Sequence, residues 1–367
     1  MTRWRCGAKA NERSAVLIGV FGSPSPLSYW MFGALRTTVE LCFPHHFAIG
    51  VSNLSQLREA VTNSAGAPVL CFCDCPEVDL AQLILESGAP YLISLEAPLE
   101  TVGFCAAERG LEPPAALRLT VQCLSALQDL AVGPNARHFV RNRESRVSDF
   151  VLEFCRTFRL TSETSIALEA VRRLSGEGEG SDPLVEDLIL RNNQFAKPLG
   201  IYSRLFTDGD APAWIGQVAK SYLPISEGRS AESMLWPREA FFDPTAENRI
   251  VLPNVDLIGP SRALLYGPYL HLPRGLWRAL FGIEVSDASS NALTVDVALN
   301  GAPIKIGRIN LPGRGRFEFS LDFEIEEPRH FVEFRIVLLN GAIEGKVSLS
   351  GVSLVRVQSN FAKIQAI

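Results

Sequence analysis

The sequence predicts two folded domains of different class: an α/β domain built on an open, mainly parallel sheet, followed by an antiparallel β-sandwich of the jelly-roll type. In the first half, short apolar runs alternate with longer segments of helical spacing, as in a sheet with crossover helices. From about Arg249 the hydrophobic pattern has period two. At 367 residues the chain is too long for one single-core domain. We therefore assign residues 1–175 to the α/β domain, 176–248 to a linker and mixed connection, and 249–367 to the sandwich.

Each element of the first half follows from its local pattern. Continuous apolar runs predict buried strands, and apolar residues at intervals of three and four predict helices. The predicted strands are 15–21, 45–51, 68–73 and 91–95, and the predicted helices are 27–43, 54–63, 78–87, 114–130 and 148–158. Alternating Gly and Glu from Gly176 to Gly180, followed by Pro183, predict a flexible linker or loop. Residues 184–195 and 213–223 have helical spacing.

The last third of the chain alternates apolar and polar residues between regularly spaced turns. The predicted strand-forming segments are 264–273, 275–285, 292–311, 316–325 and 330–357. Asn300-Gly301 and Asn340-Gly341 each stand between alternating runs. Asn-Gly favours a two-residue hairpin because both central residues of a type I′ turn need positive φ. Many such strands without a helical period indicate a sandwich.

Composition excludes several classes of function. The chain carries 35 basic and 40 acidic residues, a net charge of -5, so it lacks the positive field that holds a nucleic-acid backbone. We therefore expect no nucleic-acid partner. No apolar run reaches the roughly 20 residues of a membrane-spanning helix. The eight cysteines all precede residue 156, which argues against a disulfide framework over the whole chain and favours a reducing cytoplasm.

Metal and nucleophile motifs are not evident in the sequence. Cys71, Cys73 and Cys75 point to one face of a strand, but no second Cys or His pair follows at zinc-site spacing, so we expect core residues and no bound metal. His45 and His46 are adjacent and face opposite sides of a strand. Neither a nucleophile elbow nor an HExxH motif is present.

An Arg-rich stretch at 137–146 is the main charged feature of the first domain. Its basic residues could hold an anion, or they could form ordinary surface ion pairs. His138 could act as a base, or be a surface or helix-cap histidine. The members of this candidate anion site are Arg137, His138, Arg141, Arg143 and Arg146.

The segment VLIGVFGSPSPLSYWMFGALR has the strand-loop-helix layout of a phosphate cradle. It resembles the opening of the sulfotransferase family, whose loop binds the 5′-phosphosulfate of 3′-phosphoadenosine 5′-phosphosulfate. Trp30 falls where that family often has an aromatic residue. The positions that correspond to the family's loop are Gly22, Ser23, Pro24, Ser25 and Ser28, with Ser25 in place of the basic residue.

A second segment, YLISLEAPLETVGF, is similar to the part of that family that grips the 3′-phosphate of the donor. Pro98 is retained, but Glu96 stands at the position of an arginine. A carboxylate there reverses a favourable interaction with the donor's phosphate. The resemblance therefore implies a degenerate, non-catalytic domain without a cofactor. It also predicts that Glu96 lies near the loop from Gly22 to Ser28, where α/β sheets bind ligands.

The sandwich segment resembles carbohydrate-binding modules attached to bacterial polysaccharide-processing enzymes. Sugar rings stack on flat aromatic side chains, while planar polar groups bind their hydroxyls. The candidate glycan-binding residues are Tyr266, Tyr269, His271, Arg274 and Trp277. Alternatively, Tyr and Trp at alternating strand positions fill the core. This alternative is the stronger one for Trp277.

Together these features predict a cytoplasmic accessory protein of bacterial surface-polysaccharide synthesis, with carbohydrate or the proteins of that synthesis as partners. Oligomerisation is compatible with this reading, and an interaction protein without ligands is a third alternative. The main alternative is an active transferase that uses 3′-phosphoadenosine 5′-phosphosulfate or another nucleotide donor and acts on carbohydrate.

Overall fold

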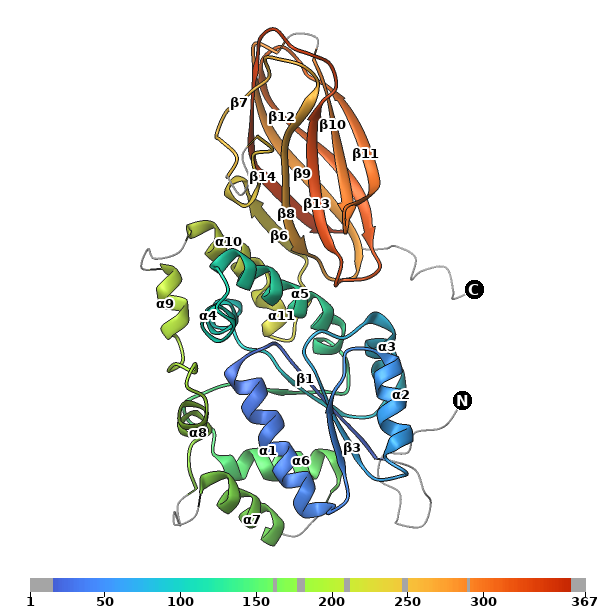
Figure 1. Cartoon of the computed structure of the whole chain (residues 1–367), viewed down its shortest axis with the longest axis vertical. Coiled ribbons are helices and arrows are strands. Elements are labelled where there is room, and N and C mark those ends of the chain that lie inside the picture. Colours follow the sequence, from blue (N-terminus) through green and yellow to red (C-terminus); the bar gives the residue numbers. More distant parts are fainter. Residues whose placement is uncertain are drawn as a thin grey trace. The chain divides into compact units, whose positions relative to one another are not determined.

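A computed structural model of the chain describes residues 16–160, 164–176, 182–207, 212–245, 250–288 and 291–357 (Figure 1). The chain divides into two compact units. The α/β unit comprises Met1–Asp208 and Ile225–Arg229, and the sandwich unit comprises Gly209–Pro224 and Ser230–Ile367. The predicted combination of a parallel α/β sheet with an antiparallel sandwich is confirmed. Most of the Gly-Glu segment, residues 177–181, lies outside the described residues.

The α/β unit is built on a five-stranded parallel sheet with the strand order β2-β3-β1-β4-β5. The strands are β1 (Leu17–Gly22), β2 (Phe47–Gly50), β3 (Val69–Cys73), β4 (Tyr91–Ser94) and β5 (Ala136–Phe139). The central strand β1 is almost entirely buried, which explains its continuous apolar run. The edge strand β5 was not predicted, because it is partly exposed and carries Arg137 and His138.

Helices α1 to α5 connect the strands of the sheet, and further helices follow β5, of which α7 and α8 pack on α1 and α9 packs on α4 (Figure 1). They are α1 (Pro26–Cys42), α2 (Leu54–Asn63), α3 (Val78–Ser87), α4 (Pro98–Arg109), α5 (Pro113–Ala131), α6 (Val147–Phe158), α7 (Thr164–Ser175), α8 (Val185–Asn192) and α9 (Ile201–Thr207), and α11 (Leu223–Ser226) follows later in the chain. Residues of α1, α6, α7 and α8 share one hydrophobic core with β1. Helix α4 was not predicted, because its buried face includes Glu100, Thr101 and Gly103 beside its apolar residues.

The sandwich unit consists of two antiparallel sheets with helix α10 (Ala213–Ser221) beside β6. One sheet has the order β11-β10-β13-β8, and the other has the order β12-β9-β14-β6 with β7 paired to β14. The strands are β6 (Ser233–Pro237), β7 (Val255–Asp256), β8 (Arg262–His271), β9 (Gly275–Ser286), β10 (Ala292–Leu299), β11 (Ala302–Asn310), β12 (Gly315–Ile325), β13 (Phe331–Leu338) and β14 (Lys346–Arg356), and a 3₁₀ turn covers Arg238–Ala240. Inward rings such as Phe281 and Phe334, 5.1 Å apart, form the core between the sheets.

The two Asn-Gly predictions have different outcomes. Asn300 and Gly301 have φ values of 48° and 82° and join β10 to its antiparallel neighbour β11, so that hairpin is confirmed. The hairpin prediction at Asn340-Gly341 is wrong. That loop leads from β13 in one sheet to β14 in the other, and Ala342 bridges Gly259 there. Period-two runs on both sides of a turn do not reveal whether the second strand returns to the same sheet.

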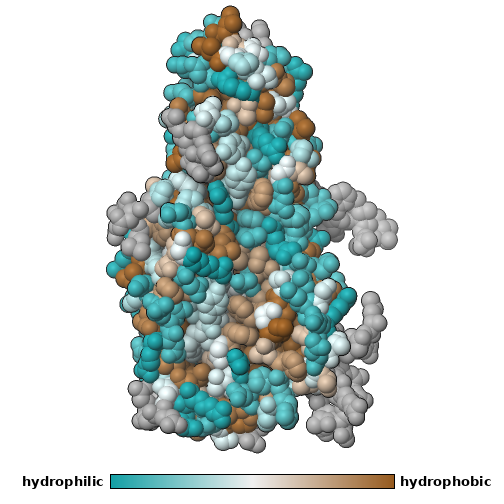
Figure 2. Space-filling view, in the orientation of Figure 1, coloured by the Kyte–Doolittle hydropathy of each residue, from teal (hydrophilic) through white to brown (hydrophobic). Residues whose placement is uncertain are grey.

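The surface of both units mixes residue types. On the face drawn in Figure 2, hydrophobic patches are bounded by hydrophilic residues. Within the described ranges, no helix has the length and apolar character that a membrane crossing requires. The same residues contain no cluster of three or more His, Cys, Asp or Glu side chains suited to a metal ion.

Candidate functional site

The loop after β1 is closed by its own side chains. Ser25 caps α1, and its Oγ accepts a hydrogen bond from the Ser28 N–H at 3.2 Å. The Ser28 hydroxyl donates to the Ser94 carbonyl on the neighbouring strand β4 at 3.3 Å. A Cβ at Gly22 would lie 2.4 Å from the Ser28 Oγ, so this packing requires glycine. Ser25 and Ser28 thus bond to the protein itself.

The remaining two loop residues are also enclosed. Ser23 is fully buried, and its N–H donates to the Ser94 carbonyl at 3.2 Å. The Pro24 carbonyl accepts from the Cys105 thiol at 3.6 Å. Pro24 and Pro26 have no N–H to offer an anion. The loop thus retains the cradle's layout, but its Ser23 N–H and Ser28 hydroxyl are already bonded to the Ser94 carbonyl.

An internal carboxylate occupies the N-terminus of α1. Glu96 follows β4 and is 3% exposed, and its Oε2 accepts from the Leu27 N–H at 3.3 Å. The predicted proximity of Glu96 to this loop is therefore confirmed. Negative charge is favourable at a helix N-terminus, where N–H groups are otherwise unpaired. Pro98 starts α4, a position that suits its fixed φ.

Arg141 connects this carboxylate to a second one. The Arg141 Nη1 lies 2.8 Å from Glu96 Oε1, and its Nε lies 2.6 Å from Glu186 Oε2. Arg141 is 6% exposed, and its Nη2 also donates to the Lys197 carbonyl at 2.7 Å. A buried cation with two carboxylates satisfies its donors within the protein. The anionic partners of Arg141 are thus two carboxylates of the protein itself, Glu96 and Glu186.

Sequence reasoning missed Glu186. It lies in the first turn of α8, 45 residues from Arg141, in a segment whose pattern indicates only an amphipathic helix. Its carboxylate also accepts from the Leu199 N–H at 3.1 Å. A buried acid at the start of a helix is indistinguishable in sequence from a solvated one, so no local signal marks the partner.

The other members of the Arg-rich stretch do not converge. The Arg143 Nη2 donates to the Leu199 carbonyl at 3.3 Å, and the Arg146 Nη1 donates to the Asp182 carbonyl at 2.7 Å. A ring nitrogen of His138, Nε2, lies 2.8 Å from the Ala131 carbonyl oxygen. Of the two alternatives for this stretch, internal pairing describes four of the five residues: Arg141 is buried in ion pairs, and His138, Arg143 and Arg146 bond to separate backbone carbonyls.

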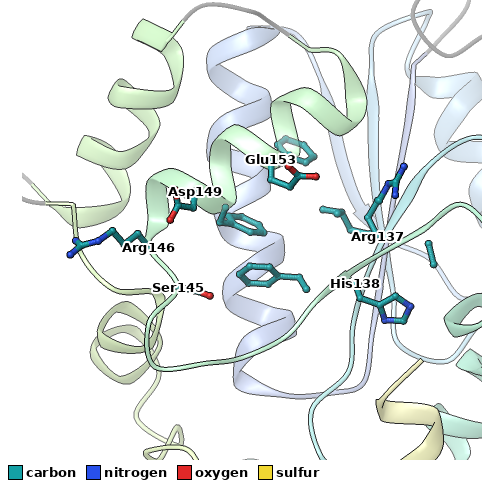
Figure 3. Close-up of a pocket in the computed structure, with 11 residues that line it drawn as sticks. Arg137, His138, Ser145, Arg146, Asp149 and Glu153 are labelled. Carbon is teal, nitrogen blue, oxygen red and sulfur yellow. The ribbon is translucent and has the colours of Figure 1, made fainter. Parts of the chain in front are cut away.

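Arg137, His138 and Arg146 line a cavity of about 460 Å³ between β5 and α6 (Figure 3). Figure 3 shows Arg146 and His138 pointing away from the rings drawn in the cavity, whereas Arg137 extends from the strand and Glu153 from the helix. Glu153 was not among the predicted site residues. It is exposed and directly precedes the buried Phe154 on α6, so its sequence pattern is that of an ordinary surface acid.

In the sandwich unit, three aromatic rings gather on the outer face of the four-stranded sheet. The ring centroids of Tyr266 and Tyr269 are 6.0 Å apart, and Phe242 lies 5.6 Å from the first and 6.1 Å from the second. Phe331 contacts Tyr269 edge to face at 5.3 Å. All four rings are partly exposed. Two of them were predicted, while Phe242 and Phe331 were not.

Planar polar groups border these rings. The Tyr269 hydroxyl donates to Glu333 Oε1 at 3.2 Å, and Glu333 Oε2 pairs with the Arg335 Nη2 at 2.9 Å. Burial, followed by the Glu333 carboxylate, raises the pKa of Tyr269 to about 12, so its hydroxyl remains protonated at neutral pH. The alternation along β13 indicates that Glu333 and Arg335 lie on the outer face, because the alternate residues Val332, Phe334 and Ile336 face the core.

Strand register extends this face across the sheet. Tyr266 is opposite Arg335, Arg335 is opposite Asp296, and Asp296 is opposite Ile306. Directly opposed residues on neighbouring strands point to the same face. The row therefore carries an aromatic ring, a guanidinium and a carboxylate side by side. We call Phe242, Tyr266, Tyr269, Phe331, Glu333, Arg335 and Asp296 the aromatic face.

The three other predicted glycan-binding residues do not belong to this face. Trp277 is 0% exposed, and its Nε1 donates to the Pro273 carbonyl at 2.9 Å, so the predicted glycan contact is wrong and the core alternative holds. His271 is 6% exposed, with its Nδ1 3.2 Å from the Pro328 carbonyl oxygen, and cannot stack on a sugar either. Arg274 is exposed on the β8–β9 turn, where its carbonyl accepts from Arg356.

Comparison with known proteins finds solved structures that resemble the C-terminal part of the chain. No protein family model matches the chain, and the search of curated proteins finds no match. The structure of TmCBM61 in complex with β-1,4-galactotriose is similar over 28% of this chain and 69% of its own, with 14% identity and a TM-score of 0.23. A family 35 carbohydrate binding module from Clostridium thermocellum is similar over 35% of this chain and 100% of its own, with 8% identity and a TM-score of 0.23. The C-terminal domain of the sugar-binding protein EclA is similar over 28% of this chain and 72% of its own, with 14% identity and a TM-score of 0.18.

Proposed function

We propose that the chain binds carbohydrate through the aromatic face of the sandwich unit. The observation that supports this is the contact of Tyr266, Tyr269 and Phe242 beside the Glu333–Arg335 ion pair. Partly exposed rings offer stacking surfaces to the C–H face of a sugar. The partly exposed Arg335 guanidinium offers donors to its hydroxyls, and the buried Glu333 carboxylate orients that guanidinium. This combination of apolar and planar polar groups is typical of a small-molecule site.

For the α/β unit we propose a non-catalytic role. A sulfotransferase-like donor would need the N-terminus of α1 and nearby cations, and here Glu96 holds both. Displacing that carboxylate would leave it buried beside an incoming phosphate. The unit would then serve as a scaffold. We propose that the whole chain is a cytoplasmic accessory component of bacterial surface-polysaccharide synthesis, in which the sandwich unit engages the glycan.

Glycan binding is tested with the full-length chain on an array of neutral and acidic bacterial oligosaccharides, followed by calorimetric titration of the best ligand. Tyr266→Ala and Arg335→Ala are each expected to weaken binding at least tenfold, about 1.4 kcal/mol. The matched control is Arg316→Ala, since Arg316 is an exposed strand arginine of the other sheet with its own ion pair to Glu284. If no oligosaccharide binds, or if all three variants bind like the wild type, the proposal is wrong.

The alternative, an active transferase with a nucleotide donor, makes the opposite prediction for the other unit. We expect no heat on titration with millimolar 3′-phosphoadenosine 5′-phosphate, because the α1 N-terminus already holds a carboxylate. A micromolar dissociation constant, equivalent to about 8 kcal/mol, would reverse the assignment and direct attention to transferase assays. The glycan titration of the same sample serves as the positive control for folded protein.

A further inference from the structure

Aromatic side chains that pack against one another form one wall of the cavity between β5 and α6, which we call its floor. Phe139 from the strand and Phe150 from the helix have ring centroids 4.5 Å apart, and both line the cavity with Phe154 and Leu92. Trp30 supports them from α1, at 5.1 Å from Phe150. The cavity of about 460 Å³ falls within the range of small-ligand sites, about 300–1,000 Å³. An apolar group of a ligand can therefore contact rings that are already ordered.

Charged groups of both signs border this floor without pairing to each other. Arg137 is exposed, and neither its guanidinium nor the Asp149 carboxylate forms a hydrogen bond or ion pair with any residue that the structure describes. Glu153 accepts only a 3.5 Å hydrogen bond from the Thr157 hydroxyl within those ranges. Figure 3 shows Glu153 on the helix and Arg137 on the strand that border the cavity. Both side chains line the cavity, and no ion pair joins them within the described residues.

The edge of the sheet is open at the same place. β5 pairs only with β4 within the described residues, and the Tyr91 N–H donates to the Asn135 carbonyl. Backbone groups alternate in direction along a strand, so those of His138 face away from β4. The backbone groups of His138, a residue that lines the cavity, therefore have no partner on β4.

We propose that this cavity binds a small zwitterion with an aromatic body, of the α-amino acid type. Its carboxylate would meet the Arg137 guanidinium, its ammonium group would meet Glu153, with Asp149 adding negative charge nearby, and its ring would pack on Phe150 and Phe154. A purely anionic ligand would face two carboxylates, and a purely cationic one would face Arg137. The arrangement thus favours a ligand that carries both charges.

The experiment is calorimetric titration of the full-length chain with L-phenylalanine, 3-phenylpropanoate and 2-phenylethylamine, supported by saturation-transfer NMR at millimolar ligand. The zwitterion is expected to bind at least tenfold more tightly than either singly charged analogue. Arg137→Gln and Glu153→Gln should each weaken its binding at least tenfold. The matched control is Arg156→Gln, since Arg156 is an exposed residue of the same helix that does not line the cavity.

Each other outcome overturns the proposal. Failure of L-phenylalanine to bind would mean that the cavity has no such ligand. Equal binding of 3-phenylpropanoate, unaffected by Glu153→Gln, would show a site for anions only. Unchanged binding in both cavity variants would place the ligand elsewhere on the molecule. Because Arg137 and Glu153 are exposed, their variants should fold, and a thermal melt of each verifies this.

Discussion

Replacing Arg141 with alanine is expected to destabilise the α/β unit by about 3–5 kcal/mol, because it removes the cation that pairs with two buried carboxylates. Glu96 and Glu186 would keep their backbone donors, Leu27 N–H and Leu199 N–H, but would lose ion pairs of 2.8 and 2.6 Å. Amide hydrogen exchange in β4 and α8 measures the effect locally. This is preferable to one global midpoint, since a chain of two units need not unfold in a single transition.

Two further variants separate charge from packing. The triple variant Glu96→Gln, Arg141→Met, Glu186→Gln removes all three charges and is expected to be more stable than Arg141→Ala alone. Arg173→Ala is the control, because Arg173 and Glu169 form a 3.0 Å ion pair on the surface, and such a pair contributes about 0–1 kcal/mol. If Arg141→Ala were no more destabilising than Arg173→Ala, the buried network would not be what holds α8 to the sheet.

An element of this fold could be predicted from the sequence where its burial produces a recognisable local pattern of apolar residues. β1 and β3 are buried on both faces and appear as unbroken apolar runs, and the helices 54–63 and 78–87 are predicted with their observed bounds. The sulfotransferase resemblance predicted Glu96 beside the loop, at the edge where the strand ends of a parallel sheet meet. In each case the deciding interaction lies within an element or follows from the sheet type.

Features that depend on distant partners could not be predicted. Nothing local distinguishes Glu186, whose partner is Arg141, from an exposed helix acid. Arg137 and Arg141 are four residues apart, yet one is exposed at a cavity and the other is buried. In the sandwich, alternation shows that Tyr266 and Trp277 are on strands, but which face each side chain occupies depends on register and on a bulge at Val332–Glu333.

Trp277→Ala is the second change with a large expected effect, a loss of about 3–5 kcal/mol in the stability of the sandwich unit. The side chain is fully buried between the sheets, and its removal leaves a cavity and frees the Pro273 carbonyl from the indole N–H. Tyr266→Ala, by contrast, truncates a half-buried ring and is expected to cost about 1 kcal/mol. Hydrogen exchange in β9 and β14 reports on the Trp277 variant, and calorimetry with the glycan reports on both.

The two variants together decide which aromatic residues serve the core and which serve the ligand. We expect Tyr266→Ala to lose glycan affinity at nearly full stability and Trp277→Ala to lose stability first. If Trp277→Ala does not fold, Trp277→Phe preserves most of the volume and removes only the hydrogen bond, at a cost of about 1–3 kcal/mol. A Trp277→Phe variant of unchanged stability that no longer bound glycan would make Trp277 a binding residue. Because the indole is 0% exposed, a sugar could reach it only if the sheets separated, which the close packing of Phe281 and Phe334 between them opposes.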